Sequence, residues 1–204
     1  GAHLSLLERH QAWKEIFSAD ARAELYRPGR AATIEPIELL RSHYEESDGA
    51  DELARVMDLD LGIFLVEDML VKTDRASMAN SLEARVPFLD PVVAEFALSL
   101  PTRLKVRGFE KKRLLRRAVE PLIPREVLEG RKQGFAIPIG QWLRHELQPF
   151  VLEALSPERI RTQGFFQPET VTRLVDAHVS GARDHSRRLW ALLVFSLWHD
   201  RYAT

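Results

Sequence analysis

The chain contains no cysteine. This excludes disulfide bonds, thiolate metal sites and a cysteine nucleophile within these residues, and it fits a reducing compartment such as the cytoplasm. Long hydrophobic runs are missing too, because no apolar stretch reaches the roughly 18 residues that a membrane span needs. We find no secretory signal. A surplus of one charge is also lacking: the formal net charge is −1, so no global field draws the protein to nucleic acid or to a membrane.

Several motifs that bind nucleotides or support nucleophilic catalysis are absent. The sequence has no GxGxxG, no P-loop and no GxSxG, and no two histidines show HxxxH spacing. Alternating strand patterns are almost missing, which predicts a mainly α protein. A length of 204 residues suits one domain or two small ones, and we expect one helical domain over residues 1–204. Residues 1–3 can be read as the remnant of an expression tag.

One stretch, residues 60–90, interleaves apolar and charged residues: DLGIFLVEDMLVKTDRASMANSLEARVPFLD. We predict a long helix from about Asp51 to about Lys72, with a further helical turn through Met78. Its second half is apolar nearly all round, so we expect that half to be buried. Asp68, Lys72 and Arg75 stand at i, i+4 and i+7 on one face. This spacing favours a buried or half-buried ion pair that orients helices; the alternative is a carboxylate that fixes a catalytic lysine or a substrate ammonium.

The end of that stretch and a later loop carry further candidates. Glu83, Arg85 and Asp90 surround Pro87, and we favour a structural turn whose backbone groups bond to local side chains. Lys132 lies in a loop between two glycines, where a lysine can act as a mobile point charge on phosphate oxygens. A basic run favours a solvated face, or a contact with the acidic stretch 45–52, over nucleic-acid binding: Arg103, Lys105, Arg107, Lys111, Lys112, Arg113, Arg116 and Arg117.

Prolines and acidic residues mark most of the predicted helix starts. We expect helices over 4–17, 20–25 (capped by Asp20), 36–44, 91–100, 111–119, 124–129 and 186–201, and further ones that begin at 138, 157 and 168. A short extended piece is expected over 104–106. Val92, Val93 and Phe96 should form the inner face of helix 91–100, and the last helix, apolar almost all round, should lie in the core. His178 is predicted as a core-edge histidine rather than a metal ligand.

Three stretches together resemble one protein family: LVKTDRASMANSLEARVPFLD (70–90), LPTRLKVRGFEKKRLLRRAV (100–119) and PREVLEGRKQGFAIPIGQWLR (124–144). In this order and spacing they look like the C-terminal part of glutamine-hydrolysing asparagine synthetases. The tail HVSGARDHSRRLWALLVFSLWHDRY is similar to that family's ending, so the resemblance covers about residues 60–202. The fold it implies is the helical C-terminal portion of an adenine-nucleotide α-hydrolase-like (pyrophosphate-loop) synthetase domain, with most of the central parallel sheet missing.

The resemblance implies a two-domain enzyme. An N-terminal glutaminase domain releases ammonia by means of an N-terminal cysteine. The synthetase domain adenylates the side-chain carboxylate of aspartate with Mg-ATP, and ammonia then displaces AMP. This chain departs from the pattern, because the glutaminase domain, the SGGxDS pyrophosphate loop and the SGxGADE stretch are not in it. We therefore expect a fragment that does not turn over alone.

Two site residues follow from matching the family's motifs. Lys132 matches the lysine of the RKxGF stretch, which contacts phosphates and stabilises charge as pyrophosphate leaves or ammonia adds. Asp68 best matches the family acid one helical segment before EARVPFLD, and Asp74 is the alternative. Substrate or structural support is assigned to Asp74, Arg75, Lys72, Glu83 and Arg85, with an architectural role favoured for Glu83 and Arg85. No metal ligand is assigned in this chain.

The expected activity is that of an asparagine synthase-like amidotransferase and ligase of asparagine biosynthesis, which uses glutamine, ATP and Mg and forms AMP and pyrophosphate. The expected partners are the glutaminase domain and pyrophosphate-loop region of the same enzyme, and aspartate or another carboxylate; nucleic acid and membrane are not expected. The sequence leaves a homodimer open. The alternatives are a stand-alone helical scaffold or partner-binding module, and a related amide-forming synthetase of the β-lactam or peptide-cyclising type.

Overall fold

The computed structural model describes residues 4–30, 34–130 and 137–203. Helices dominate these residues, and the sheet found among them is a two-stranded hairpin of β1 (Val106–Arg107) and antiparallel β2 (Glu110–Lys111). The prediction of a mainly α chain is confirmed. The chain divides into two compact units: unit 1 comprises residues 1–10 and 36–133, and unit 2 comprises 11–35 and 134–204. One domain over residues 1–204 stays a prediction.

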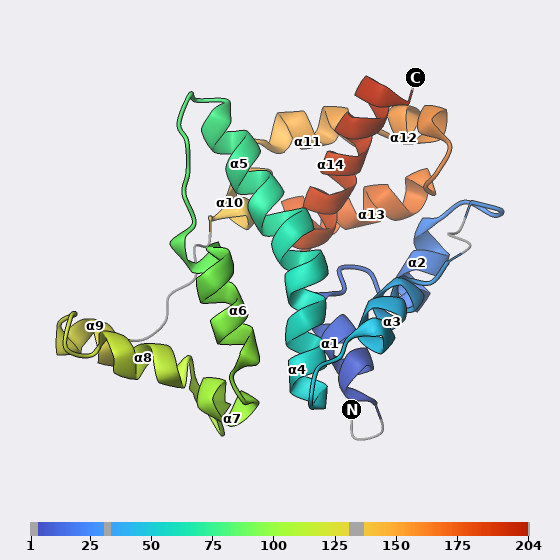
Figure 1. Ribbon diagram of the computed structural model, residues 1–204. Helices are drawn as coiled ribbons and strands as arrows, with labels where there is room; N and C mark the ends of the chain where they lie inside the picture. Colours follow the sequence, from blue (N-terminus) through green and yellow to red (C-terminus); the bar gives the residue numbers. More distant parts are fainter. Residues whose placement is uncertain (1–3, 31–33, 131–136, 204) are drawn as a thin grey trace. The chain divides into compact units, whose positions relative to one another are not determined.

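The helices follow one another in chain order, as Figure 1 shows. Helix α1 (Leu6–Lys14) begins in unit 1 and ends in unit 2. Unit 1 also holds α3 (Pro36–Glu46), α4 (Glu52–Leu59), the π-helix η1 (Asp60–Leu70), α5 (Val71–Met78), the 3-10 turn η2 (Pro87–Leu89), α6 (Pro91–Ser99), α7 (Thr102–Lys105), α8 (Arg113–Val119) and α9 (Arg125–Glu129). Unit 2 holds α2 (Ala19–Leu25), α10 (Ile139–Arg144), α11 (Gln148–Ala154), α12 (Pro157–Gln163), α13 (Pro168–Val179) and α14 (Ser186–Tyr202).

Local start signals explain most of these boundaries. Helices α3, α6, α12 and α13 begin with proline, whose fixed φ and missing N–H suit the first helical turn. Asp90 caps α6, because its Oδ1 accepts hydrogen bonds from the backbone N–H groups of Val92 and Val93 at 3.0 and 3.4 Å. The predicted cap of α2 is wrong: Ser18 accepts from the next turn, and Asp20 already lies inside the helix. The expected extended piece 104–106 is also mostly wrong, since α7 continues to Lys105.

Helices α4, η1 and α5 form one continuous helical rod (Figure 1). The long helix predicted over this region is therefore present, and it extends to Met78. Its middle is a π-helix, which the apolar pattern did not predict. Gly62 lets α3 approach this segment, since a Cβ there would lie 3.2 Å from the His43 ring.

The expected burial of this rod and of α6 is wrong. No residue of η1, α5 or α6 is buried, and Phe64 of η1 and Phe96 of α6 are 43% and 62% exposed. The inner face predicted for α6 includes Val92, which is 76% exposed. The physical reason is a lack of cover, because the described residues of unit 1 leave these apolar side chains open to solvent.

Unit 2 has a closed core. Buried side chains from α2 and α10–α14 form it: Leu25, Leu143, Val151, Ala154, Leu155, Ile160, Phe166, Val171, Val175, Leu189, Leu192 and Leu193. Helix α14 contributes one face to this core, as predicted, but its opposite face is open, with Trp190 and Trp198 about half exposed. The end of α2 joins the start of α13 through backbone bonds on both sides of the Tyr26–Phe166 bridge. No helix among the described residues is both long and apolar enough to cross a membrane.

Candidate functional site

The charged face predicted on the long helix is present but exposed. Lys72 Nζ lies 3.4 Å from Asp68 Oδ1, so the i, i+4 pair forms across the junction of η1 and α5. Both side chains are more than half exposed. Water screens such a pair, so it contributes little to stability. The predicted ion pair is thus confirmed, but the expectation that it is buried or half-buried is wrong.

Asp74 lies in different surroundings. It lines an open cavity of about 350 Å³, together with Thr73 and the apolar side chains of Val66, Leu70, Val71, Ala84 and Val86. The cavity therefore joins the long helix to the EARVPFLD segment within unit 1. Asp68 does not line this cavity. Which of the two carboxylates acts at a site remains a prediction.

The EARVPFLD segment forms a local, exposed structure. Glu83 Oε1 and Arg85 Nη2 lie 2.7 Å apart, with both side chains largely exposed. Leu89 and Asp90 donate their N–H groups to the carbonyls of Val86 and Pro87, which closes the η2 turn before α6. These contacts are local to the segment, and the architectural role of Glu83 and Arg85 stays a prediction. Lys132 lies outside the described residues.

Asp51, in the acidic stretch, interacts with the start of α7. The pKa of Asp51 is lowered, first by the Ala54 N–H that it caps, then by the Thr102 hydroxyl, and to a smaller extent by Lys105. Asp51 begins α4 and Thr102 begins α7. Lys105 is the member of the basic run that acts on Asp51 here, through a small electrostatic effect, and a direct contact between the two stretches stays a prediction.

His178 is completely buried and both of its ring nitrogens are used. Its Nδ1 accepts the backbone N–H of His185 at 3.1 Å, and its Nε2 lies 3.1 Å from the carbonyl oxygen of Gly140. This pattern places the ring proton on Nε2. The prediction of a core histidine rather than a metal ligand fits this arrangement.

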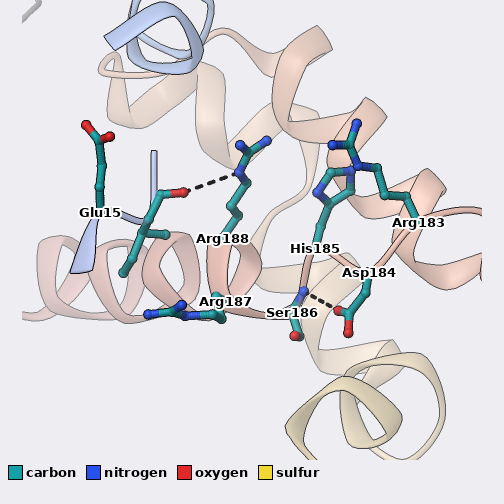
Figure 2. Close-up of a pocket in the computed structure, with 8 residues that line it drawn as sticks. Glu15, Arg183, Asp184, His185, Ser186, Arg187 and Arg188 are labelled. Carbon is teal, nitrogen blue, oxygen red and sulfur yellow. Dashed lines mark hydrogen bonds between the residues drawn. The ribbon is translucent and has the colours of Figure 1, made fainter. Parts of the chain in front are cut away.

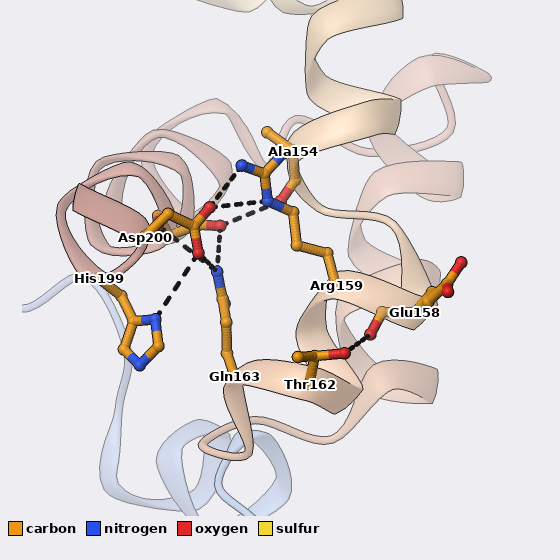
Figure 3. Close-up of polar contacts among 8 residues, drawn as sticks. Ala154, Glu158, Arg159, Thr162, Gln163, His199 and Asp200 are labelled. Carbon is orange, nitrogen blue, oxygen red and sulfur yellow. Dashed lines mark hydrogen bonds and ion pairs between the residues drawn. The ribbon is translucent and has the colours of Figure 1, made fainter. Parts of the chain in front are cut away.

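Unit 2 also contains a polar network that sequence reasoning missed (Figure 3). The Gln163 side-chain amide donates to Ser196 Oγ at 2.7 Å and to Asp200 Oδ1 at 2.9 Å. Arg159 Nε donates to the other oxygen of Asp200 at 2.7 Å. These contacts lower the pKa of Asp200, the Gln163 amide most and Arg159 less. The available signal was the i, i+4 pair Ser196 and Asp200, in which Ser196 interrupts the apolar run of α14.

Binding of Mg-ATP would require side chains that can hold the magnesium ion. Among residues 4–30, 34–130 and 137–203, no group of three or more His, Asp or Glu side chains could hold a metal ion. Magnesium is held by carboxylates together with substrate phosphates. The described part of this chain does not meet that requirement by itself.

Comparison with known proteins agrees with the helical pattern and motifs. The family model described as asparagine synthase matches residues 3–200. A protein of Mycobacterium tuberculosis, provisionally named asparagine synthetase (glutamine-hydrolyzing), is 40% identical over 96% of this chain. Asparagine synthetase (glutamine-hydrolyzing) 1 of Bacillus subtilis is 32% identical over the same share. No solved structure gives a significant match.

The relatives are much longer than this chain. It spans 30% of the length of both bacterial proteins, and 24% of the rat asparagine synthetase, which is 31% identical over 59% of the chain. The family match, in contrast, runs through both units. By this match the chain belongs to the asparagine synthase family.

Proposed function

We propose that this chain is the C-terminal helical part of the synthetase domain of a glutamine-hydrolysing asparagine synthetase. The observation that carries the proposal is the continuous similarity over 96% of the chain to relatives that bear this name. The reaction proposed for the whole enzyme is adenylation of the aspartate side chain by ATP and then amidation by ammonia from glutamine. The proposed cofactors are ATP and Mg, and the proposed location of the enzyme is the cytoplasm.

The uncovered apolar surface of unit 1 supports a role as part of a larger domain. Leu82, Phe88, Val92, Phe96 and Leu122 are all more than 60% exposed, unlike the closed core of unit 2. Soluble proteins rarely leave apolar surface of this extent open unless another surface covers it. We propose that the pyrophosphate-loop region of the same enzyme packs against it. A glutaminase domain completes the enzyme, and homodimer formation stays open.

The proposed chemistry of this chain centres on Lys132. Its ammonium would stabilise the negative charge that develops on phosphate oxygens as pyrophosphate leaves, and Asp68 or Asp74 would orient that lysine. Lys72 and Arg75 would hold the acidic residue in place from the same helix, which is supported by the 3.4 Å contact of Lys72 with Asp68. Glu83 and Arg85 are proposed as architectural residues.

The test uses the full-length enzyme that contains this chain. We expect Lys132→Ala to lower asparagine synthesis by about a hundredfold or more and to spare glutaminase activity. Lys111→Ala, which removes an exposed lysine on β2, is the matched control and should leave both activities unchanged. If Lys132→Ala keeps full synthesis, the role proposed for this lysine is wrong.

Two further measurements test which aspartate is the site acid and whether the isolated chain is inactive. Asp68→Asn and Asp74→Asn, compared in ATP–pyrophosphate exchange, identify the site acid as the variant with the larger loss. Residues 1–204 alone should show no exchange, because the nucleotide loop of the family is not in this sequence. Clear exchange by the isolated chain would contradict its assignment as an incomplete part of the site.

A further inference from the structure

A basic pocket lies at the start of α14 in unit 2 (Figure 2). Its volume is about 320 Å³, and it is lined by Glu15, Ile16 and the consecutive residues 183–188. Three of these six consecutive residues are arginines: Arg183, Arg187 and Arg188. Neither the sequence motifs nor the proposed synthetase chemistry assigns a task to this pocket, which lies apart in sequence from the predicted site residues 68–85 and 132.

The carboxylates of the pocket are already engaged. Glu15 Oε1 lies 2.6 Å from Arg22 Nη1. Asp184 Oδ1 accepts the backbone N–H of Ser186 at 2.9 Å, and its pKa is lowered, most of all by this bond. Asp184 also lies 3.5 Å from the His178 ring. Neither acid forms an ion pair with an arginine of residues 183–188.

The arginines, in contrast, have no acidic partners among the described residues. Arg188 Nε donates to the Ile16 carbonyl oxygen at 3.3 Å, and its guanidinium lies over the Phe17 ring at 5.4 Å. These contacts hold the side chain in place and leave its charge uncompensated. Arg183 and Arg187 likewise form no ion pair within the described part of the chain. The pocket therefore carries excess positive charge on a partly fixed frame.

His185 adds an imidazole to the lining of the pocket. The residue is only 8% exposed, yet its ring nitrogens have no hydrogen-bond partner among the described residues. Figure 2 shows the imidazole between the side chains of Arg183 and Arg188. It also lines an adjoining cavity of about 200 Å³ that shares both arginines. The ring nitrogens are not fully buried and make no hydrogen bond within the described residues, so an oxyanion in the pocket can accept a bond from the ring N–H.

The helix itself supplies further donors. Helix α14 is 17 residues long, and its first N–H group, on Ser186, is capped by Asp184. The next two backbone N–H groups, on Arg187 and Arg188, have no acceptor among the described residues. Free N–H groups and the helix dipole together attract anions to a helix start.

We propose that this pocket binds a phosphate-type oxyanion, held by Arg183 and Arg188, with His185 and the first turn of α14 as hydrogen-bond donors. A tetrahedral anion suits the site because its oxygens can meet guanidinium, imidazole and backbone donors from different directions. Arginine forks bind phosphate through paired N–H groups. The cavity is larger than one phosphate, so the anion can be free or the phosphate group of a small ester. The proposal is independent of the synthetase assignment.

Isothermal titration calorimetry of residues 1–204 at low ionic strength tests this site, with inorganic phosphate and phenyl phosphate as the two probes. We expect saturable binding with one site per chain. Arg183→Gln and Arg188→Gln should each weaken it about tenfold or more, because each removes a charge-assisted bond. Arg161→Gln is the matched control: it removes an exposed arginine of α12 outside the pocket and should leave affinity unchanged. Tighter binding of phenyl phosphate would assign the pocket to esters, and tighter binding of inorganic phosphate to the free anion.

Two results would overturn the proposal. One is the lack of saturable binding of either probe, and the other is an equal loss of affinity in Arg161→Gln, which would reveal a general charge effect. Arg188 packs on Phe17, so its variant must first show the parent's circular dichroism; the exposed Arg183 gives the decisive variant if it does not. As a second readout, phosphate should shift the NMR signals of the His185 ring in the parent chain. If those signals stay unchanged while binding is seen, the anion lies elsewhere.

Discussion

Replacing Ser196 by alanine tests whether the buried polar network stabilises unit 2. The Ser196 hydroxyl is fully buried, donates to the Ala154 carbonyl oxygen at 3.0 Å and accepts from the Gln163 amide at 2.7 Å. Ala154 is the last residue of α11, and its carbonyl oxygen accepts no other hydrogen bond among the described residues. Removing the hydroxyl leaves this buried oxygen unpaired, while Gln163 keeps its bond to Asp200.

Ser196→Ala has two opposing effects on stability: it leaves a buried acceptor unpaired, and it raises the helix propensity of the position. A buried acceptor without a partner costs about 1–3 kcal/mol. Alanine returns about 0.5 kcal/mol, because it is the better helix former. We therefore expect the free energy of unfolding to fall by about 0.5–2.5 kcal/mol in Ser196→Ala.

Urea unfolding followed by tryptophan fluorescence measures this loss of stability in unit 2. All four tryptophans, at positions 13, 142, 190 and 198, belong to unit 2, so the signal reports that unit. Ser180→Ala is the matched control: its hydroxyl also donates to a backbone carbonyl, that of Asp176, but it is exposed and water can replace it. The control should change stability by less than about 0.5 kcal/mol. Equal effects of the two substitutions, or a more stable Ser196→Ala, would refute the reasoning.

Three further predictions concern the core, a carboxylate and a cap. Leu189→Ala should cost about 2–5 kcal/mol, because Leu189 is fully buried in unit 2, whereas Leu197→Ala on the open face of α14 should cost far less in the same urea assay. The pKa of Asp200 is lowered in the folded protein, so its stabilising contribution is present at neutral pH and is lost as the pH falls through the acidic range; the urea midpoints of the parent and Asp200→Asn should converge as the pH falls below 3.8, the ordinary pKa of an aspartate. Asp90→Ala should weaken α6 by about 1 kcal/mol, seen as faster amide hydrogen exchange in that helix, while Asp90→Asn keeps a capping oxygen and should exchange nearly as the parent does.

Helix starts and the core of unit 2 could be predicted from the sequence because their causes are local. Pro91, Pro157 and Pro168 each fix the first turn of a helix whatever packs around it. Leu189 lies on an apolar face that tertiary packing then buries. The cap of α2 was misassigned by two residues, since Ser18 and Asp20 both have capping side chains and only backbone geometry distinguishes them.

Burial in unit 1 could not be predicted for a different reason. The apolar residues Phe64 and Phe96 indicate that cover is favourable, but a pattern within one helix does not say which residues supply it. The π-helix could not be predicted either, because the same apolar run is compatible with both α-helical and π-helical geometry. For the candidate site, spacing predicted the contact of Asp68 with Lys72, whereas the roles of Lys132 and Asp74 rest on family resemblance.

The pocket at the start of α14 could not be predicted from the sequence either. Its arginines form a visible basic run, but Ile16 and Phe17, which position Arg188, lie about 170 residues earlier in the chain. Sequence spacing cannot reveal such a partner. The unpartnered ring of His185 is likewise a property of its neighbours and not of its sequence position.

The division of the chain has a consequence for how the protein folds. Unit 2 is built from two pieces, and residues 36–133 form a long loop between them. Helices α10–α14 are contiguous and can associate early, because their contacts close short loops. The piece that carries α2 can join only after the ends of the long loop meet, as they do where Arg27 donates to the carbonyl of Phe165. Closing a loop costs entropy that grows slowly with its length, so docking of α2 should be the late step, and it should be faster in a circular permutant that places residues 11–35 directly after α14.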